Sequence, residues 1–258
     1  MAYSLAVNLV FMRIKLLCLS LLFYILCPVI GKAQVIDSLA YRPKVSSFII
    51  PAVLVGYGLV SLSCNSPIRH LDFSTRNELQ EDHPLFAAHV DNYLQFAPAV
   101  AVYGLNLAGI KGKHSLVDAT GIYLLSEAIM SGTVFSVKRM TNRERPDHSG
   151  FNSFPSGHTA NAFAAAEFLM QEYKDVSPWY GYAGYTVATA TGVLRMYNNK
   201  HWLSDVVTGA GVGIISTKLA YIIYPKLKKL VVGTKAQQYN LIPAYQNHTF
   251  GLAFNARL

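Results

Sequence analysis

Residues 202–224, WLSDVVTGAGVGIISTKLAYIIY, form an apolar run that is interrupted by only two charged residues, Asp205 and Lys218. An α-helix needs about 20 mainly apolar residues to cross the hydrocarbon core of a bilayer. A run of this length therefore predicts a membrane-spanning helix. Further apolar stretches of similar character are found at residues 45–64, 93–110, 116–137, 156–173 and 178–197. Together they predict an all-α fold, a polytopic membrane bundle of about six helices.

The composition agrees with lipid as the solvent for much of the surface. Of the 258 residues, 52% are hydrophobic and 14% are charged, whereas a soluble domain has about 25% charged residues. The net charge is +8, but the basic residues lie mainly at the ends of apolar runs, which favours a membrane and an anionic substrate over a nucleic acid. Outside the N-terminal segment Cys64 is the only cysteine, so we expect no disulfide framework.

The N-terminal segment, residues 1–33, has the pattern of a secretory signal peptide. A basic start at residues 12–15 is followed by an apolar run and then by small residues before Gln34, as in cleaved signals. An uncleaved first membrane anchor is the alternative, because the apolar run approaches the length of a span.

The rest of the chain divides into a core and a tail. Residues 34–230 are expected to form the membrane core, in which the polar segment 65–91 reads as an amphipathic surface stretch. Residues 231–258 are polar and aromatic, and they are expected to form either a hairpin around residues 246–248 or a disordered tail.

The loops at the two ends of the predicted helices differ in charge. The connections at residues 111–113, 174–175 and 225–229 are short and basic, which predicts that they face the cytoplasm. The other connections, 138–155 and 198–201, should then face the periplasm.

This orientation conflicts with a cleaved signal peptide. A cleaved signal leaves Gln34 outside, and three full spans would then place Lys138 inside. Either residues 45–64, which contain Pro51, enter the membrane without crossing it, or the first 30 residues do not translocate the chain behind them.

Polar clusters lie at the expected periplasmic ends of the helices, and they are Lys138 with Arg145-Pro146, then Pro155-Ser156-Gly157-His158, then Arg195 with His201 and Asp205. Arginine and lysine pair with phosphate oxygens, arginine in bidentate fashion. A helix that starts at Ser156 presents backbone N–H groups to an anion, and Gly157 leaves room for it. Ser156 also fits a simple helix cap, and both roles can hold at once.

His201 and Asp205 are four residues apart, so they share one face of a helix. A carboxylate bonded to one imidazole nitrogen fixes the tautomer and leaves the other nitrogen free to attack. Because three side-chain cations can neutralise a phosphoryl group, we expect no metal ion and no other cofactor.

The order and spacing Lys138-x6-Arg145-Pro146, Pro155-Ser156-Gly157-His158 and Arg195-x5-His201-x3-Asp205 resembles the signature of the type 2 phosphatidic acid phosphatase superfamily, and the resemblance covers about residues 45–229. It implies a six-helix bundle with the site near the membrane surface. It implies that His201 is the nucleophile, oriented by Asp205, and that His158 donates a proton to the leaving oxygen. The residues that it assigns to phosphate binding are Lys138, Arg145, Arg195, Ser156 and Gly157.

One position departs from the superfamily pattern. Leu194 stands where a serine usually precedes the third-cluster arginine. That serine is a secondary phosphate contact, so the departure concerns the fine geometry of substrate binding and not the reaction.

The function expected from the resemblance is that of a phosphatase in the bacterial inner membrane with its site facing the periplasm. Through a phosphohistidine intermediate it would hydrolyse the phosphate monoester or terminal pyrophosphate of an anionic lipid, with lipid A or a phospholipid phosphate as the favoured substrate. Undecaprenyl diphosphate is the alternative substrate. A vanadium haloperoxidase-like enzyme, and a transporter or channel, are the alternative classes.

Ionisable residues within the predicted spans need partners. We expect Lys218 to pair with Glu127 or with Glu167 as a structural tie between helices.

Overall fold

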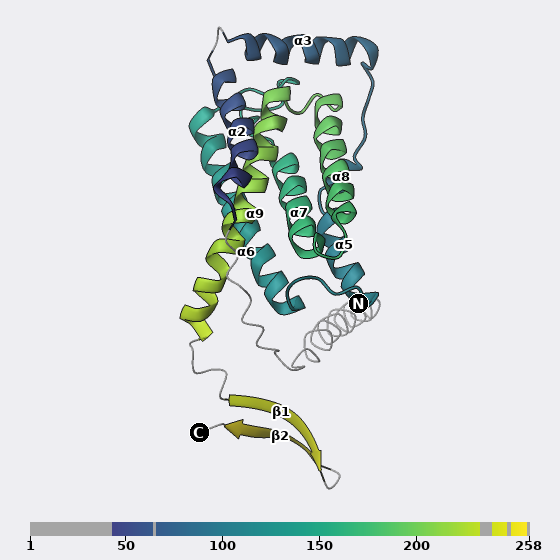
Figure 1. The fold of residues 1–258 in the computed structure, drawn as a ribbon. Coiled ribbons are helices and arrows are strands. Elements are labelled where there is room, and N and C mark those ends of the chain that lie inside the picture. The colour runs from purple at the N-terminus through teal and green to yellow at the C-terminus, as the bar shows by residue number, and fades with distance from the viewer. Residues whose placement is uncertain (1–42, 64–65, 233–238, 247–248, 257–258) are drawn as a thin grey trace, which may run out of the picture. The chain divides into compact units, whose positions relative to one another are not determined.

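The computed structural model describes residues 43–63, 66–232, 239–246 and 249–256 (Figure 1). The expected signal segment, residues 1–33, lies outside the described residues. The chain divides into two compact units, one of which is the helical unit Leu39–Val231. The C-terminal hairpin belongs to the other unit and is described by itself.

The helical unit begins with the 3-10 helix η1 (Val45–Phe48). The α-helices of this unit are α2 (Ile49–Ser61), α3 (Pro67–Asp82), α4 (Asp91–Leu94), α5 (Ala97–Leu107), α6 (Leu116–Thr141), α7 (Gly157–Tyr173), α8 (Pro178–Tyr197) and α9 (Leu203–Val232). Each apolar stretch expected to be helical contains a helix, and the predicted all-α class of this unit is confirmed. The amphipathic stretch forms α3, and the predicted helix at 93–110 is divided between α4 and α5.

Polar residues set the ends of the helices that carry the site. Ser115 and Ser156 cap α6 and α7, because each side chain accepts a hydrogen bond from a backbone N–H in the first turn, as N-cap residues do. Asn142 ends α6 in the left-handed conformation, with φ 41°, and its N–H donates to the carbonyl oxygen of Lys138 at 3.1 Å. Asn142 and Ser156 therefore bound the loop between α6 and α7 at one end of the bundle.

Helix α7 packs against α9 through glycines on one face of α9. A Cβ atom added to Gly209 would lie 2.6 Å from the carbonyl oxygen of Ser156, and one added to Gly213 would lie 2.2 Å from that of Ala160. Two helix backbones can approach this closely only where no side chain intervenes. The contact therefore holds the start of α7 against the start of α9.

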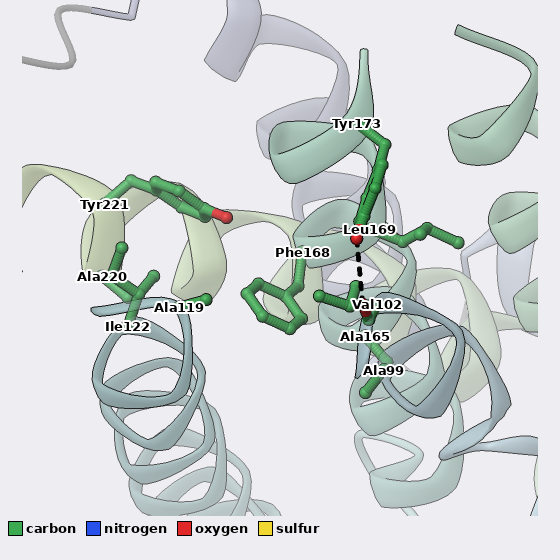
Figure 2. Close-up of a cluster of buried hydrophobic side chains, with 10 residues drawn as sticks. All are labelled: Ala99, Val102, Ala119, Ile122, Ala165, Phe168, Leu169, Tyr173, Ala220 and Tyr221. Carbon is green, nitrogen blue, oxygen red and sulfur yellow. Dashed lines mark hydrogen bonds between the residues drawn. The ribbon is translucent and has the colours of Figure 1, made fainter. Parts of the chain in front are cut away.

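The opposite end of the bundle is closed by an apolar cluster from α5, α6, α7 and α9. Figure 2 shows its members, which are Ala99, Val102, Ala119, Ile122, Ala165, Phe168, Leu169, Tyr173, Ala220 and Tyr221. The hydroxyl of Tyr173 donates to the carbonyl oxygens of Val102 and Ile110, both at 3.0 Å. The tyrosine therefore closes this cluster without leaving its own polar atom unpaired.

Helices α6 and α9 are long and apolar enough to span a membrane, over Leu116–Thr141 and Leu203–Val231. Leu124 and Phe135 of α6 are 63% and 57% exposed, so the apolar surface of this helix is not covered by protein. An exposed apolar surface marks a site of membrane or protein interaction. Together with the two long apolar helices, it agrees with a helical unit that lies in a membrane. The apolar helices Val45–Ser61 and Ala97–Leu107 are shorter.

The structure decides which acid pairs with Lys218. The ammonium nitrogen of Lys218 on α9 lies 2.7 Å from a carboxylate oxygen of Glu167 on α7. This was one of the two pairings predicted. Glu127, the other candidate, lies on α6 and has different neighbours.

Helix α2 runs antiparallel to α9. Gly58, near its C-terminal end, lies against Thr208, and Pro51, near its start, lies against Gly211. The C-terminal end of α2 is therefore at the same end of the bundle as the start of α9. Of the two topological alternatives, one concerns residues 45–64, which contain the short apolar helix Val45–Ser61. The other concerns the first 30 residues, which lie outside the described residues.

The C-terminal hairpin has two antiparallel strands, β1 (Tyr239–Gln246) and β2 (Thr249–Ala256). Gln246 is paired with Thr249 next to the turn. The structure thus has the hairpin, which was one of the two alternatives for the tail.

Candidate active site

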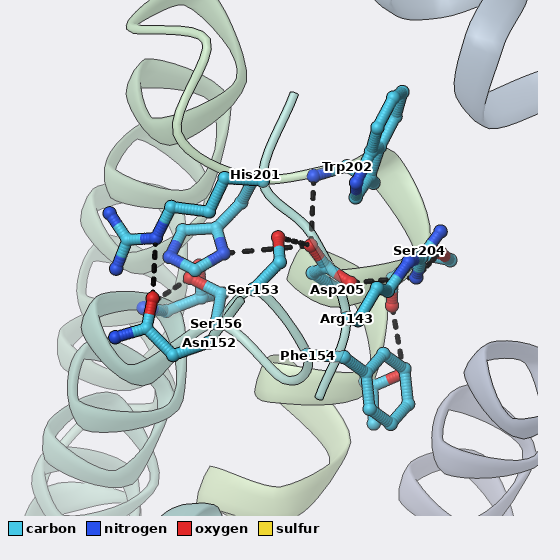
Figure 3. Close-up of polar contacts among 12 residues, drawn as sticks. Arg143, Asn152, Ser153, Phe154, Ser156, His201, Trp202, Ser204 and Asp205 are labelled. Carbon is cyan, nitrogen blue, oxygen red and sulfur yellow. Dashed lines mark hydrogen bonds and ion pairs between the residues drawn. The ribbon is translucent and has the colours of Figure 1, made fainter. Parts of the chain in front are cut away.

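Asp205, in the first turn of α9, has a fully buried side chain whose two oxygens are both engaged. Oδ1 accepts a hydrogen bond from Nη1 of Arg143 at 2.7 Å. Oδ2 accepts from the backbone N–H of Trp202 at 3.0 Å and from the hydroxyl of Ser153. Figure 3 shows Asp205 between His201 and Arg143. The carboxylate is held in one orientation before any substrate binds.

Arg143 connects this carboxylate to a second buried acid on α3. Its Nη2 donates to Oδ2 of Asp72 at 2.5 Å, and Asp72 also accepts from the backbone N–H and the hydroxyl of Ser204, at 2.8 and 2.7 Å. The side chains of Arg143 and Asp72 are 4% and 0% exposed. Buried charges persist only when they are paired and hydrogen-bonded, and here one guanidinium compensates two carboxylates.

Arg143 and Asp72 could not be identified from the sequence. Arg143 lies two residues before Arg145, in a loop with several charged residues, and Asp72 lies in the segment interpreted as a surface stretch. Neither has a recognisable spacing to Asp205. The burial of these two side chains is the signal, and it appears only in the tertiary structure.

His201 lies in the loop before α9 and is 3% exposed. Its Nδ1 is 3.6 Å from Oδ2 of Asp205, which is an ion-pair distance and too long for a hydrogen bond, and Nδ1 has no hydrogen-bond partner among the described residues. Burial, together with the charges of Lys138 and Arg195, lowers the pKa of His201 to about 4 against the opposing effect of Asp205. The imidazole is therefore neutral at neutral pH, and Asp205 favours the tautomer that leaves Nε2 unprotonated.

Two of the predicted phosphate-binding cations meet at Asn152. The ammonium group of Lys138 donates to the carbonyl oxygen of Asn152 and, at 3.5 Å, to that of Ser153. Nε of Arg145 donates to the side-chain oxygen of Asn152 at 2.8 Å. Within the described ranges, neither cation forms an ion pair. Burial and the charge of Arg195 both lower the pKa of Arg145. Arg145 and Arg195 therefore repel each other unless an anion binds between them.

The short helix α4 holds the other two side chains of the site. Arg195, at the end of α8, donates from Nη1 to Oδ2 of Asp91 at 2.6 Å, and Asp91 is 1% exposed. His158, in the first turn of α7, has its Nε2 at 2.9 Å from the side-chain oxygen of Asn92. Asp91 and Asn92 were not identified from the sequence, because they lie more than 60 residues before the nearest motif residue that they contact.

Ser156 acts as the cap of α7. Its hydroxyl accepts hydrogen bonds from the N–H and the hydroxyl of Thr159, at 3.4 and 2.9 Å, and its own N–H donates to the carbonyl oxygen of Asp205 at 3.0 Å. A Cβ atom on Gly157 would meet only Val134, at 3.8 Å. Protein packing therefore does not require glycine here, and the space beside this backbone is open to a ligand. Phosphate contact by Ser156 and Gly157 stays a prediction.

A groove of about 460 Å³ opens beside these residues. Lys138 and Gly157 form one end of its lining, and Phe96 and Phe135 are among its apolar walls. Leu194, by contrast, brings no polar side chain to the site. The three sequence motifs thus converge at one end of the helical unit, and they do so next to a groove with both cationic and apolar walls.

Residues 118–229 match the PAP2 superfamily. Among curated proteins, the lipid A 1-phosphatase of Porphyromonas gingivalis is 40% identical over 174 residues, which cover 66% of this chain and 37% of the relative. The lipid A 1-phosphatase of Rhizobium etli is 31% identical over 140 residues, which cover 47% of this chain and 58% of the relative. The chain thus spans well under two thirds of either relative.

One solved structure that this chain matches is the first transmembrane PAP2 type phosphatidylglycerolphosphate phosphatase from Bacillus subtilis. It matches with a TM-score of 0.46 and 17% identity, over 72% of this chain and 98% of that one.

Proposed function

Because this chain belongs to the PAP2 superfamily, we propose that it is a phosphatase that removes a phosphate group from an anionic membrane lipid. The observation that carries the proposal is the environment of His201. A buried imidazole with a lowered pKa lies within the field of Lys138 and Arg195, and Lys138 and Arg145 have only neutral hydrogen-bond acceptors in the described part of the chain. A phosphoryl group supplies the negative charge that these cations lack.

In the proposed reaction the unprotonated nitrogen of His201 attacks phosphorus, and a phosphorus–nitrogen bond forms while the bond from phosphorus to the lipid oxygen breaks. His158 gives a proton to the leaving oxygen. Asp205 stabilises the positive charge that develops on His201. A water molecule then attacks phosphorus, gives a proton to His158 and releases inorganic phosphate, which restores the free imidazole.

The cations and backbone amides would hold the phosphoryl group through both steps. The residues proposed for this role are Lys138, Arg145, Arg195, Ser156 and the N–H of Gly157. Their contribution is positioning and neutralisation of the transition-state charge, which is the main protein contribution to phosphoryl transfer.

The substrate we favour is a lipid A phosphate. Two relatives bear the name lipid A 1-phosphatase, and the groove beside Lys138 has apolar walls suited to acyl chains. The test is phosphate release by the purified protein in detergent from lipid A, phosphatidylglycerophosphate, phosphatidate and undecaprenyl diphosphate. We expect the highest kcat/KM with lipid A and loss of all release in His201→Ala. No release from any of these lipids would overturn the proposal.

The covalent intermediate has a separate test. Rapid quenching with labelled substrate under acid-free conditions should trap a phosphoprotein that is labile in acid and stable in base. His201→Ala should abolish the label. Label on serine or aspartate would contradict the mechanism, and so would loss of activity in a chelator.

We also propose that the protein is a multi-pass protein of the bacterial inner membrane with its site facing the periplasm. Basic residues such as Lys113 and Lys226 lie at the end of the bundle opposite the site, which supports a cytoplasmic position for that end. In a variant that lacks the native cysteines, a single cysteine can be introduced at each of these positions and at the exposed Asn142 and Ser149 near the site. An impermeant thiol reagent should label the latter pair in intact spheroplasts, and labelling of only the former would invert the orientation.

A further inference from the structure

Glu127 is an ionisable residue in the middle of α6, and no cation pairs with it within the described part of the chain. Lys218, one candidate partner, pairs with Glu167 instead. The amide of Asn161, in the orientation that satisfies both side chains, places its nitrogen 2.9 and 3.1 Å from the two carboxylate oxygens of Glu127. A carboxyl group within an apolar helix is costly and is normally retained for a function. A neutral amide does not neutralise a carboxylate, so the contact with Asn161 does not by itself explain why a carboxyl group is present at this position.

Glu127 faces the same groove as the phosphate-binding cation Lys138. Residues 127, 131, 134 and 138 of α6 follow the spacing four, three, four, so they share one helix face, and all of them line the groove. At 1.5 Å per residue, Glu127 lies about 16 Å along the helix axis from Lys138. The groove therefore joins the phosphate end of the site to the carboxyl group and to Asn161, which also lines it.

The walls between these two ends are mainly apolar. Phe96, Met130 and Phe135 are among the groove residues, and Phe135 is 57% exposed. Apolar walls that continue from a phosphate site suit the acyl-bearing part of the same molecule. A carboxylate in such surroundings has lost most of its water, so a hydrogen-bond donor that enters the groove would restore part of its lost solvation.

We propose that Glu127, oriented by Asn161, is a specificity-determining residue that accepts a hydrogen bond from an amide N–H or a hydroxyl group on the acyl-bearing part of the substrate. The proposal rests on the proposed phosphatase function, which places the lipid phosphate at Lys138. A lipid without such a donor would leave Glu127 with only its protein partners, Asn161 and Tyr123, in a groove that is mainly apolar. Sites built around a buried polar group discriminate strongly against ligands that lack its partner.

The experiment compares three phosphorylated lipids of equal chain length in detergent. One carries an amide-linked acyl chain, one an ester-linked hydroxyacyl chain, and one only simple ester-linked chains. The full-length wild type should favour at least one of the first two lipids over the third. In Glu127→Leu, which keeps the volume and removes the acceptor, the kcat/KM ratio of the preferred lipid to the simple ester should fall about 10-fold. Which ratio falls identifies the donor as an amide or a hydroxyl.

Two further variants distinguish recognition from a structural role. Glu127→Gln retains a carbonyl acceptor without the charge, so it should keep part of the preference. Phe135→Leu changes the apolar wall alone, so it should alter all three rates without changing their ratio. The loss in Glu127→Leu should appear mainly in KM, because the contact is remote from phosphorus and is present in ground state and transition state alike.

The outcomes separate this inference from the function on which it rests. Unchanged ratios in both Glu127 variants, with an active wild type, would overturn the role of Glu127 and leave the phosphatase proposal in place. A wild type that releases phosphate from none of the lipids would overturn both. An equal loss of kcat/KM on all three lipids in Glu127→Leu would contradict the inference, because it would show that Glu127 has only a structural role.

Discussion

Arg143 and Asp205 form a buried ion pair of 2.7 Å between the loop after α6 and the first turn of α9 (Figure 3). The same guanidinium group reaches Asp72 on α3. One side chain thus joins three segments that are distant in sequence, and it contacts the acid that is proposed to orient His201. The arrangement makes Arg143 a positioning residue, since it is expected to act on the reaction through Asp205.

Replacement of Arg143 by alanine should both destabilise the protein and impair catalysis. The substitution leaves two buried carboxylates without a counter-charge, and breaking a buried pair in this way costs about 3–5 kcal/mol. Thermal unfolding in detergent should show the loss, together with reduced phosphate release. Arg139→Ala is the matched control, because Arg139 is exposed and packs only over the ring of Phe135. Equal effects of the two substitutions would contradict the role of Arg143.

The imidazole of His201 should remain neutral through pH 5–8 in the ligand-free protein. Burial disfavours the imidazolium form, which lowers the pKa of His201 to about 4, so the proton is already lost well below neutral pH. Carbon-detected NMR of labelled histidine gives the titration midpoint, and the signal missing in His201→Gln assigns it. In Asp205→Asn the midpoint should move lower still, because the negative charge of Asp205 raises the pKa of His201. A midpoint of 6.5 or higher would show that burial does not control this group.

His158→Ala should slow lipid turnover far more than turnover of an aryl phosphate. A lipid or sugar alkoxide is a poor leaving group and benefits from a proton delivered in the transition state, an effect typically worth about 10²–10⁴ in rate. A phenolate leaves without such help. The decisive quantity is the ratio of the losses on the two substrates, with His201→Ala as the comparison that should remove both activities. If the two losses for His158→Ala are the same, His158 binds phosphate and the acid is another group.

Gly209→Ala should weaken the contact between α7 and α9. The added methyl group would meet the carbonyl oxygen of Ser156 at 2.6 Å, and a backbone atom cannot yield as a flexible side chain does, so we expect a loss of about 1–3 kcal/mol and reduced activity. Gly132→Ala on α6 is the control, since nothing lies within 4 Å of the added atom. The measurement is thermal unfolding of both variants in the same detergent. A Gly209 variant as stable as the Gly132 variant would mean that the helices shift apart without cost.

The residues proposed to carry the chemistry could be singled out from the sequence because their signals are local. His201 and Asp205 are four residues apart, Ser156 and Gly157 open a helix, and the apolar runs predict where the helices lie. The predicted shared helix face of His201 and Asp205 was wrong, because α9 begins at Leu203 and His201 lies in the loop before it. Each of these inferences uses the spacing of neighbouring residues, which a single sequence contains in full. The all-α class of the helical unit and the ends of most helices follow from the same patterns.

The supports of the site could not be predicted, because their partners are remote in sequence. Asp72 reaches Ser204 over 132 positions, and Asp91 reaches Arg195 over 104. Such contacts have no period and no fixed spacing, so they depend on how the helices pack. The pairing of Lys218 with Glu167, and not with Glu127, likewise depends on how the helices pack.

The sequence alone therefore determined which side chains are proposed to act on a phosphate, since helical periodicity and charge are properties of short segments. Only the tertiary structure decided what holds them. The close approach of α7 to α9 at Gly209 places Ser156 against Asp205, and the fold then buries Arg143 between Asp205 and Asp72. Burial makes pairing obligatory for each of these charges, and burial is a property of the packed helices and not of any one of them.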